Sequence, residues 1–310
     1  MNSPMPDDFR KKIEQELESG NNSTRRPQRS KSKQRPDSKP YIKKTGHKNP
    51  DTPQNTRPGS RPPMGIQTTT LWEYPSQHYD SQLGNMQGRK DYTGATPSWV
   101  IYQLLKRYTN QGDTVLDPMC GSGTTLDVCK DLGRTGIGYD LNPHPQRPDI
   151  KQNDARKLPI DNNSIDFAFI DPPYSTHVDY SDDPRCIGKL DASQPADRTQ
   201  TVMGQDYYQA MDAVLGELYR VLKPGKFLGL YVSDSWKKKK GKQGDQAGTF
   251  MPIGFELFSM MSQAFTPVDI ICVVRHNNKL QRGNWHKSAE AENFYLRGFN
   301  YLFIMKKDPR

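Results

Sequence analysis

The sequence predicts an α/β fold: a doubly wound, mostly parallel, seven-stranded sheet with an antiparallel edge and helices on both faces. From about residue 69 onward, strand-like runs alternate with amphipathic helical runs, which is the order of a parallel sheet. One short apolar strand enters a glycine-rich turn that opens a helix, as in open α/β sheets that bind ligands. The last two strand-like runs follow each other with no clear helix between them, which predicts the antiparallel edge.

The helices are identified by their apolar period and by the residues that flank them. Pro97 opens the first helix, and Lys223-Pro224-Gly225 stops the longest. We expect helices over residues 98–108, 124–132, 206–222 and 254–263. We expect strands over residues 114–116, 136–139, 165–170, 227–232, 267–275 and 299–306.

Residues 1–68 are predicted to form a disordered basic arm, and residues 69–310 a single domain. The arm contains ten prolines and 15 Lys and Arg against 7 Asp and Glu, so it carries +8 of the net charge of +9. Such a composition buries too little apolar surface to offset chain entropy, apart from a short helix expected over residues 7–18. The arm either attracts nucleic-acid phosphates without sequence preference or only keeps the chain in solution.

Several classes of protein are excluded by simple counts. No run of about 18 apolar residues is present, and the first residues lack the apolar core of a secretory signal, so we expect a cytoplasmic protein. Four cysteines without a CxxC pair indicate reduced thiols rather than a disulfide framework or a zinc site. The histidines are too scattered to predict a metal site.

The segment Thr114–Thr125 reads TVLDPMCGSGTT and places Asp117 at the carboxyl end of a strand. Gly121 and Gly123 then let the backbone turn tightly and approach a ligand. The third glycine of a dinucleotide fingerprint and the lysine of a phosphate-binding loop are both missing. An acid before the turn repels phosphate and suits a cationic or amine-bearing ligand.

This segment resembles motif I of the S-adenosylmethionine-dependent DNA amino-methyltransferases, the N4-cytosine/N6-adenine DNA methylase family. The usual form is D-P-F-x-G-S-G-T-T, from which Met119 departs. Asp171-Pro172-Pro173-Tyr174, 54 residues after Asp117, resembles motif IV of the same family. The resemblance implies a Rossmann-like class I methyltransferase fold and S-adenosyl-L-methionine as the cofactor.

The resemblance also implies a set of cofactor-binding residues. Asp140 matches the acid that binds the ribose hydroxyls, and Asp154 the residue that contacts the adenine ring, although either acid could instead cap a loop. Thr96-Pro97 stands in the place of motif X, which wraps the methionine end, although a plain packing helix would also begin there. The cofactor-binding residues expected are Thr96, Pro97, Asp117, Pro118, Cys120, Gly121, Ser122, Gly123, Thr124, Asp140, Asn142, Asp154 and Ala155.

The catalytic residues expected are Asp171, Pro172, Pro173 and Tyr174. An exocyclic base amine is a poor nucleophile, and Asp171 with the Pro172 carbonyl can accept both of its N–H hydrogens, which aims the nitrogen lone pair at the methyl group. Tyr174 can stack on a base flipped out of the duplex. Asp rather than Asn at position 171 favours a nucleobase over a protein glutamine. Methylation at cytosine C5 needs a thiolate after a proline, and the chain has no Pro-Cys pair.

Substrate recognition is expected from loops, because only 16 residues separate Asp154 from Asp171 and no room for a recognition domain is left. Residues 175–205 form either a substrate lid or a surface insertion, and the lysine run 237–242 either contacts phosphates or is merely solvated. Residues 275–297 mix basic, amide and aromatic side chains, as groove contacts or base stacking require. The substrate-binding residues expected are His177, Lys237, Lys238, Arg275, Arg282, Trp285 and Arg297.

Together these motifs predict a DNA methyltransferase that acts on an exocyclic base amine, with adenine N6 favoured and cytosine N4 as the alternative. The same DPPY site would also suit an RNA base or a guanine-N2-type reaction, and a non-catalytic binding module is the remaining reading. We expect duplex DNA with a flipped base as the partner and a nucleoid location, and the role stays open between restriction-modification, an orphan enzyme and a phage-borne enzyme. A homodimer or a separate specificity partner would supply the sequence recognition for which no separate domain is expected. No metal is expected.

Overall fold

The computed structural model describes residues 64–81, 83–84, 86–92, 94–175, 181–193, 206–237, 249–276, 280 and 282–309. The chain separates into two units, residues 1–52 and residues 53–310, and all described residues belong to the second. The helix expected over residues 7–18 and most of the basic arm lie outside the described residues. Within the described part of the chain, no helix is long and apolar enough to cross a bilayer.

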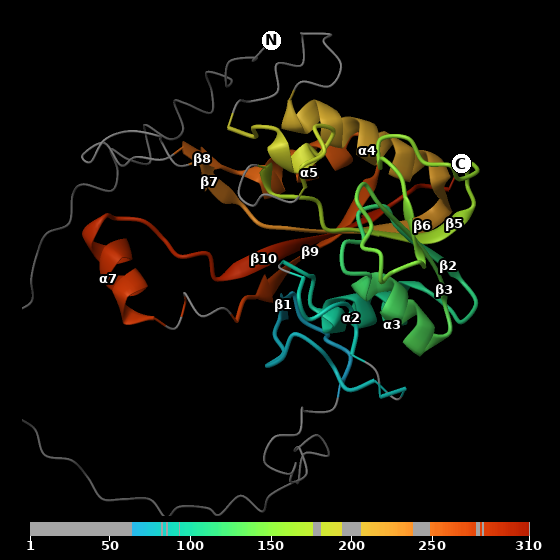
Figure 1. Cartoon of the computed structure of the whole chain (residues 1–310), viewed down its shortest axis with the longest axis horizontal. Helices are drawn as coiled ribbons and strands as arrows, with labels where there is room; N and C mark the ends of the chain where they lie inside the picture. The colour runs from blue at the N-terminus through green and yellow to red at the C-terminus, as the bar shows by residue number, and fades with distance from the viewer. Residues whose placement is uncertain are drawn as a thin grey trace, which may run out of the picture. The chain divides into compact units, whose positions relative to one another are not determined.

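An eight-stranded sheet forms the centre of the fold, in the order β1-β9-β10-β6-β5-β2-β3-β4 (Figure 1). Its strands are β1 (Leu71–Trp72), β2 (Thr114–Asp117), β3 (Thr135–Asp140), β4 (Ile150–Gln152), β5 (Ile165–Ile170), β6 (Leu222–Val232), β9 (Thr266–Val274) and β10 (Phe299–Lys306). Two further strands, β7 (Ser235–Lys237) and β8 (Thr249–Met251), pair antiparallel as a separate hairpin. The helices are α2 (Ser98–Tyr108), α3 (Thr124–Leu132), α4 (Tyr207–Val221), α5 (Ile253–Met261) and α7 (Gly283–Ala291), with a 3₁₀ turn, η2, at Ile187–Lys189.

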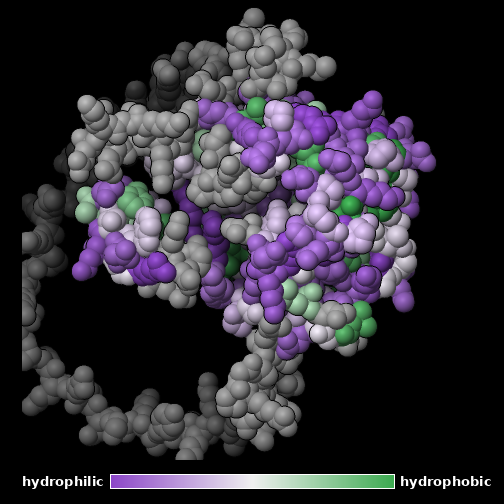
Figure 2. Space-filling view, in the orientation of Figure 1, coloured by the Kyte–Doolittle hydropathy of each residue, from purple (hydrophilic) through white to green (hydrophobic). Residues whose placement is uncertain are grey.

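Helices cover both faces of the sheet, α2 and α3 on one and α4 and α5 on the other (Figure 1). The alternation of side chains along β5 supplies both cores. Phe167 and Phe169 pack with α2, whereas Ala168 and Ile170 pack with α4 and α5. The doubly wound α/β prediction is therefore confirmed. The face drawn in Figure 2 is mainly hydrophilic, with apolar residues in small separate patches.

The sheet differs from the prediction in two details. Two short strands outside the predicted ranges bring the sheet to eight: β1 pairs parallel to β9, and β4 pairs parallel to β3. The antiparallel strand is β10, and it lies inside the sheet between β6 and β9 rather than at the edge. Because β10 runs antiparallel to both neighbours, β9 again runs parallel to the rest. The position of β10 in the sheet depends on pairing between distant segments, which strand-like runs in a sequence do not predict.

The helix boundaries follow the flanking residues on which the predictions were based. Helices α2 and α3 have the expected bounds, and α4 begins after Asp206, whose carboxylate accepts a hydrogen bond from the Gln209 backbone N–H at 2.9 Å. The segment Lys223-Pro224-Gly225 ends α4 but lies within β6, where pairing with β5 shifts register between Leu222 and Phe227. The predicted strand at 227–232 is thus the regular part of a longer one.

Candidate active site

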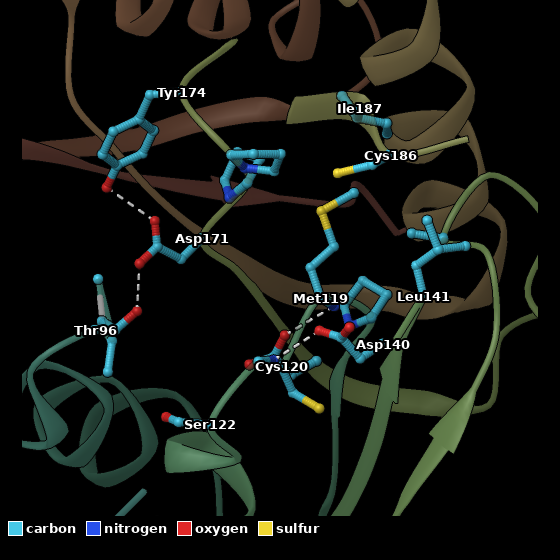
Figure 3. Close-up of a pocket in the computed structure, with 18 of the residues that line it drawn as sticks. Thr96, Met119, Cys120, Ser122, Asp140, Leu141, Asp171, Tyr174, Cys186 and Ile187 are labelled. Atoms are coloured by element: carbon cyan, nitrogen blue, oxygen red, sulfur yellow. Dashed lines mark hydrogen bonds between the residues drawn. The ribbon is translucent and has the colours of Figure 1, made fainter. Parts of the chain in front are cut away.

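The carboxyl ends of the parallel strands meet at one edge of the sheet, where the loops that follow them enclose a cavity of about 490 Å³ (Figure 3). This is the edge at which open α/β sheets bind ligands. The cavity walls come from the segments after β2, β3, β4, β5 and β6, together with the chain that leads into α2. Motifs that lie far apart in the sequence therefore meet here.

Asp117 fixes the turn between β2 and α3. Its side chain is buried and accepts hydrogen bonds from the Thr125 hydroxyl at 2.6 Å and from the Met119 backbone N–H at 3.1 Å. Burial raises the pKa of Asp117 to about 7, although both hydrogen bonds lower it. Asp117 therefore shapes the floor of the cavity through bonds within its own turn.

Two glycines bring the backbone of this turn to the cavity. Gly121 and Gly123 have φ of +47° and +80°, which side chains other than glycine rarely adopt. A Cβ on Gly121 would lie 2.5 Å from the Tyr92 hydroxyl, and one on Gly123 would lie 2.3 Å from the Arg147 guanidinium. Gly121 lines the cavity directly, whereas Gly123 forms the N-cap of α3.

Asp140 joins the end of β3 to the glycine-rich turn. Its carboxylate accepts hydrogen bonds from the Gly121 backbone N–H at 3.0 Å and from the Asn142 backbone N–H at 2.9 Å. Each carboxylate oxygen can accept more than one hydrogen bond, so Asp140 retains capacity for a ligand hydroxyl. Figure 3 shows Asp140 beside Met119 and Leu141, which form an apolar part of the wall.

Asp154 is held by an arginine. The Arg156 guanidinium binds its two carboxylate oxygens, Nη2 to Oδ2 at 2.6 Å and Nε to Oδ1 at 3.0 Å, and also donates to the Arg185 carbonyl at 3.0 Å. Burial raises the pKa of Asp154, but the hydrogen bonds from Arg156 outweigh it and hold this pKa below its usual range. Asp154 is therefore a fixed carboxylate, oriented by a partner that the sequence motif did not indicate.

Asp171 lies at the centre of a chain of hydrogen bonds (Figure 3). The Thr96 hydroxyl donates to its Oδ2 at 2.5 Å, the Tyr174 hydroxyl donates to its Oδ1 at 2.9 Å, and the Asn300 amide donates to the Tyr174 oxygen at 3.1 Å. Burial raises the pKa of Asp171 to about 7, while Thr96, Tyr174 and the charge of Arg275 lower it. The carboxylate is thus oriented by two donors and titrates near neutral pH.

The backbone around motif IV is also fixed. The Tyr207 hydroxyl, at the start of α4, donates to the Pro173 carbonyl at 2.8 Å. Ser175 has a positive φ of 57°, and its hydroxyl donates to the Leu190 carbonyl at 2.7 Å and accepts from the Ala192 N–H at 2.9 Å. Motif IV is therefore held by the first turn of α4 and by the chain that follows η2.

The structure brings most of the predicted site residues to one cavity. Those that line it are Thr96, Asp117, Pro118, Cys120, Gly121, Ser122, Thr124, Asp140, Asp154, Ala155, Asp171, Pro172, Pro173, Tyr174, Arg275 and Arg297. Thr96 was expected near the cofactor's methionine end, and its observed partner is Asp171. Cys120 is buried, which raises the pKa of its thiol.

The other predicted residues lie elsewhere. Pro97 and Gly123 cap helices, and Asn142 is exposed and donates its backbone N–H to Asp140. None of the three lines the cavity. Arg282 precedes α7 and Trp285 lies on it, a helix whose nine residues include no buried one, and neither side chain lines the cavity. His177, Lys238 and the side chain of Lys237 lie outside the described residues.

Sequence reasoning missed several residues of the site. Asn300 is 4% exposed inside an otherwise apolar strand, FNYLFIM, and a lone amide in such a run was a signal that could have identified it. Trp236 lines the cavity from the β7–β8 hairpin, and Cys186 and Ile187 line it from the start of η2. These three residues belong to no motif and are placed by tertiary structure alone.

Comparison with known proteins gives partial matches to DNA methylases. The model of a family described as DNA methylase matches residues 9–150. Type II methyltransferase M.HpaI of Haemophilus parainfluenzae is 37% identical over 78 residues, 25% of this chain and 23% of that protein. Type II methyltransferase M1.MboII of Moraxella bovis is 32% identical over 80 residues, 26% of this chain and 31% of that protein. The aligned part therefore spans less than a third of the length of these relatives.

Solved structures resemble the chain only loosely. An S-adenosylmethionine-dependent methyltransferase from Methanosarcina mazei has a TM-score of 0.40 at 15% identity, covering 67% of this chain and 98% of its own. TrmN from Thermus thermophilus has a TM-score of 0.43 at 15% identity, covering 69% of this chain and 50% of its own. From the sequence matches, residues 9–150 match the N6/N4 DNA methylase family, and the chain is a distant homologue of the type II DNA methyltransferases.

Proposed function

We propose that this protein transfers a methyl group from S-adenosylmethionine to an exocyclic amine of a DNA base, with adenine N6 favoured over cytosine N4. The observation that carries this proposal is the position of Asp171 in the cavity, oriented by Thr96 and Tyr174. The preference for adenine rests on the motif, because DPPY is usual for adenine in the family and SPPY for cytosine.

The residues of the cavity fit the proposed cofactor. Asp140 would accept from the ribose hydroxyls and Asp154 from the adenine amine, since ionised carboxylates act only as acceptors. Met119, Leu141 and Ile187 offer an apolar surface for the adenine ring (Figure 3). The cavity, at about 490 Å³, lies in the size range of sites for ligands of this class.

Asp171 and the Pro172 carbonyl would act on the target amine. S-adenosylmethionine would supply an electrophilic methyl group on its sulfonium. As the amine nitrogen formed a bond to this methyl, the sulfur would keep the electron pair of the broken S–C bond. Accepting both N–H hydrogens draws the nitrogen toward a tetrahedral form, so that its lone pair points at the methyl rather than into the ring. The nitrogen then releases one proton, toward Asp171 or water. No covalent link between protein and base is required.

Tyr174 could exchange partners when the target base binds. Its hydroxyl donates to Asp171 Oδ1, one of the two oxygens that could receive a hydrogen from the amine. The Asn300 amide beside it offers an alternative, because its Oδ1 is buried and has no hydrogen-bond partner among the described residues. Rotation of this amide would turn its Oδ1 toward Tyr174, so that Tyr174 could donate to Asn300 and leave Asp171 to the base.

The test is methyl transfer by the full chain from labelled S-adenosylmethionine to duplex DNA and, separately, to RNA. We expect label in DNA, and we expect Asp171→Asn to lower the rate by about 100-fold or more while the cofactor still binds. Asp269→Asn is the matched control, because Asp269 lies exposed on β9 and accepts from the adjacent Ile270 N–H. Label in RNA alone would overturn the DNA substrate, and full activity of Asp171→Asn would overturn the catalytic role.

A further inference from the structure

Two large aromatic side chains remain exposed beside the cavity. Trp236 on β7 and Phe250 on β8 are cross-strand partners in the hairpin, with ring centroids 5.4 Å apart. They are 42% and 41% exposed, respectively. Exposed apolar surface beside a ligand cavity can mark a binding surface.

Arg297 completes this surface. Its guanidinium lies over the Phe250 ring, 4.7 Å from the centroid. Its Nε is buried and has no hydrogen-bond partner among the described residues. A buried donor without an acceptor indicates a position where an acceptor from a ligand would be favourable. We refer to Trp236, Phe250 and Arg297 as the aromatic platform.

The platform begins at the cavity and extends outward. Trp236 and Arg297 line the cavity together with Asp171, whereas Phe250 lies outside it. Arg275 also lines the cavity. Asp234, an acid in the same lining, accepts hydrogen bonds from the Gly254 N–H at 3.0 Å and the Tyr301 hydroxyl at 3.2 Å.

We propose that the aromatic platform binds the nucleotide next to the target base on the same DNA strand. The proposal rests on the function proposed above and specifies how the strand is held. When the target base lies against Asp171, its neighbour would pass the mouth of the cavity, where Trp236 and Phe250 are exposed. Stacking on these rings accepts any base, and Arg297 would pair with the phosphate between the two nucleotides.

The test measures binding of full-length protein to a DNA duplex that the wild-type chain methylates, as identified by sequencing methylated DNA. The duplex is compared with two others, each of which lacks the base, but not the sugar and phosphate, of one nucleotide next to the target. For one of the two neighbours, we expect base removal to weaken wild-type binding by about tenfold. The variants Trp236→Ala and Phe250→Ala should bind the base-lacking duplex and the intact duplex with equal affinity. That affinity should match the weaker affinity of the wild type for the base-lacking duplex.

Two further variants keep the result interpretable. Trp236→Phe retains a ring and should restore most of the preference for the intact duplex. Phe255→Ala should behave as wild type, because Phe255 is an equally accessible aromatic, 56% exposed on α5, that packs on Tyr301 rather than on the platform. If base removal weakened binding equally in wild type, Trp236→Ala and Phe250→Ala, the role of the platform would be overturned. Methylation of the intact duplex in the same experiment would still support the proposed function. If the wild type methylated no DNA at all, both proposals would fall.

Discussion

Thr96 is the residue whose role the structure changes most. Its hydroxyl donates to Asp171, and this hydrogen bond favours the charged form of the carboxylate. We expect Asp171 to be active only when ionised, because a protonated carboxyl loses acceptor capacity. Since burial raises the pKa of Asp171 to about 7, kcat/KM should fall as the pH drops below about 7, by up to about tenfold per unit.

The variant Thr96→Val tests this dependence. Removal of the hydroxyl should raise the pKa of Asp171 further, so the acid side of the kcat/KM profile should move to higher pH. The KM for S-adenosylmethionine should change little. Asp117 also has a pKa raised to about 7 by burial, but Thr96 does not contact it. If the acid side of the kcat/KM profile did not move, the titrating group would be Asp117. If only the KM for S-adenosylmethionine rose, Thr96 would contact the methionine end of the cofactor.

Asn300 is expected to position Tyr174. Asn300→Leu keeps a side chain of similar size but removes the amide that donates to the Tyr174 oxygen. We expect kcat to fall about five- to tenfold, the equivalent of one hydrogen bond, with cofactor affinity unchanged. The double variant with Tyr174→Phe should be no slower than Tyr174→Phe alone, because both remove the same interaction. Additive losses in kcat would show that Asn300 acts through something other than Tyr174.

At this scale, the sequence identified the acids but not all of the residues that orient the site. Asp117, Asp140, Asp154 and Asp171 each stand at the end of a strand or in a motif, where local sequence indicates a ligand-facing position. Arg156, which holds Asp154, and Asn300, which donates to Tyr174, belong to no motif. The amide that orients Tyr174 is 126 residues away along the chain. Such contacts arise only when distant strands pair.

Among the elements, helix α3 and strand β3 pack closely because β3 carries glycines. A Cβ on Gly138 would lie 2.7 Å from the Leu126 Cδ1 and 2.9 Å from the Cys120 Sγ. We expect Gly138→Ala to lower the free energy of unfolding by about 1–3 kcal/mol, since overpacking displaces a buried helix. Gly216 in α4 provides the opposite case, because nothing lies within 4 Å of an added Cβ there.

Gly216→Ala should raise the free energy of unfolding by about 0.5–1 kcal/mol, through lower chain entropy in the unfolded state and better helix propensity. Urea unfolding followed by circular dichroism measures both variants. If Gly138→Ala were as stable as wild type, the close approach of α3 to β3 would not limit side-chain size.

The elements that the sequence predicted best are those bounded by proline or glycine. Pro97 before α2 and Gly123 before α3 gave the correct first residue of each helix. The missed strands β1, β4, β7 and β8 have only two or three residues, too few to show a period. Helix α7 was missed because its nine residues, GNWHKSAEA, include no buried one and show no apolar stripe.

For the whole molecule, charge is divided unevenly along the chain. Residues 1–68 carry +8 of the net +9, so residues 69–310 are nearly neutral. We expect substitution of all Lys and Arg in residues 25–44 by Gln to weaken DNA binding at low salt, with a shallower dependence of log Kd on log salt. The single-turnover rate at saturating DNA should stay unchanged. Equal losses in affinity and in single-turnover rate would show that the arm takes part in the chemical step.

The central claim is that the Asp171 site methylates an exocyclic amine, and the product reports on this most directly. DNA treated with the full-length chain and S-adenosylmethionine carrying a labelled methyl group would be digested to nucleosides and separated by liquid chromatography with mass detection. We expect the label in N6-methyldeoxyadenosine, or in N4-methyldeoxycytidine if the preference for adenine is wrong. Label in 5-methyldeoxycytidine, or in no nucleoside, would contradict the account.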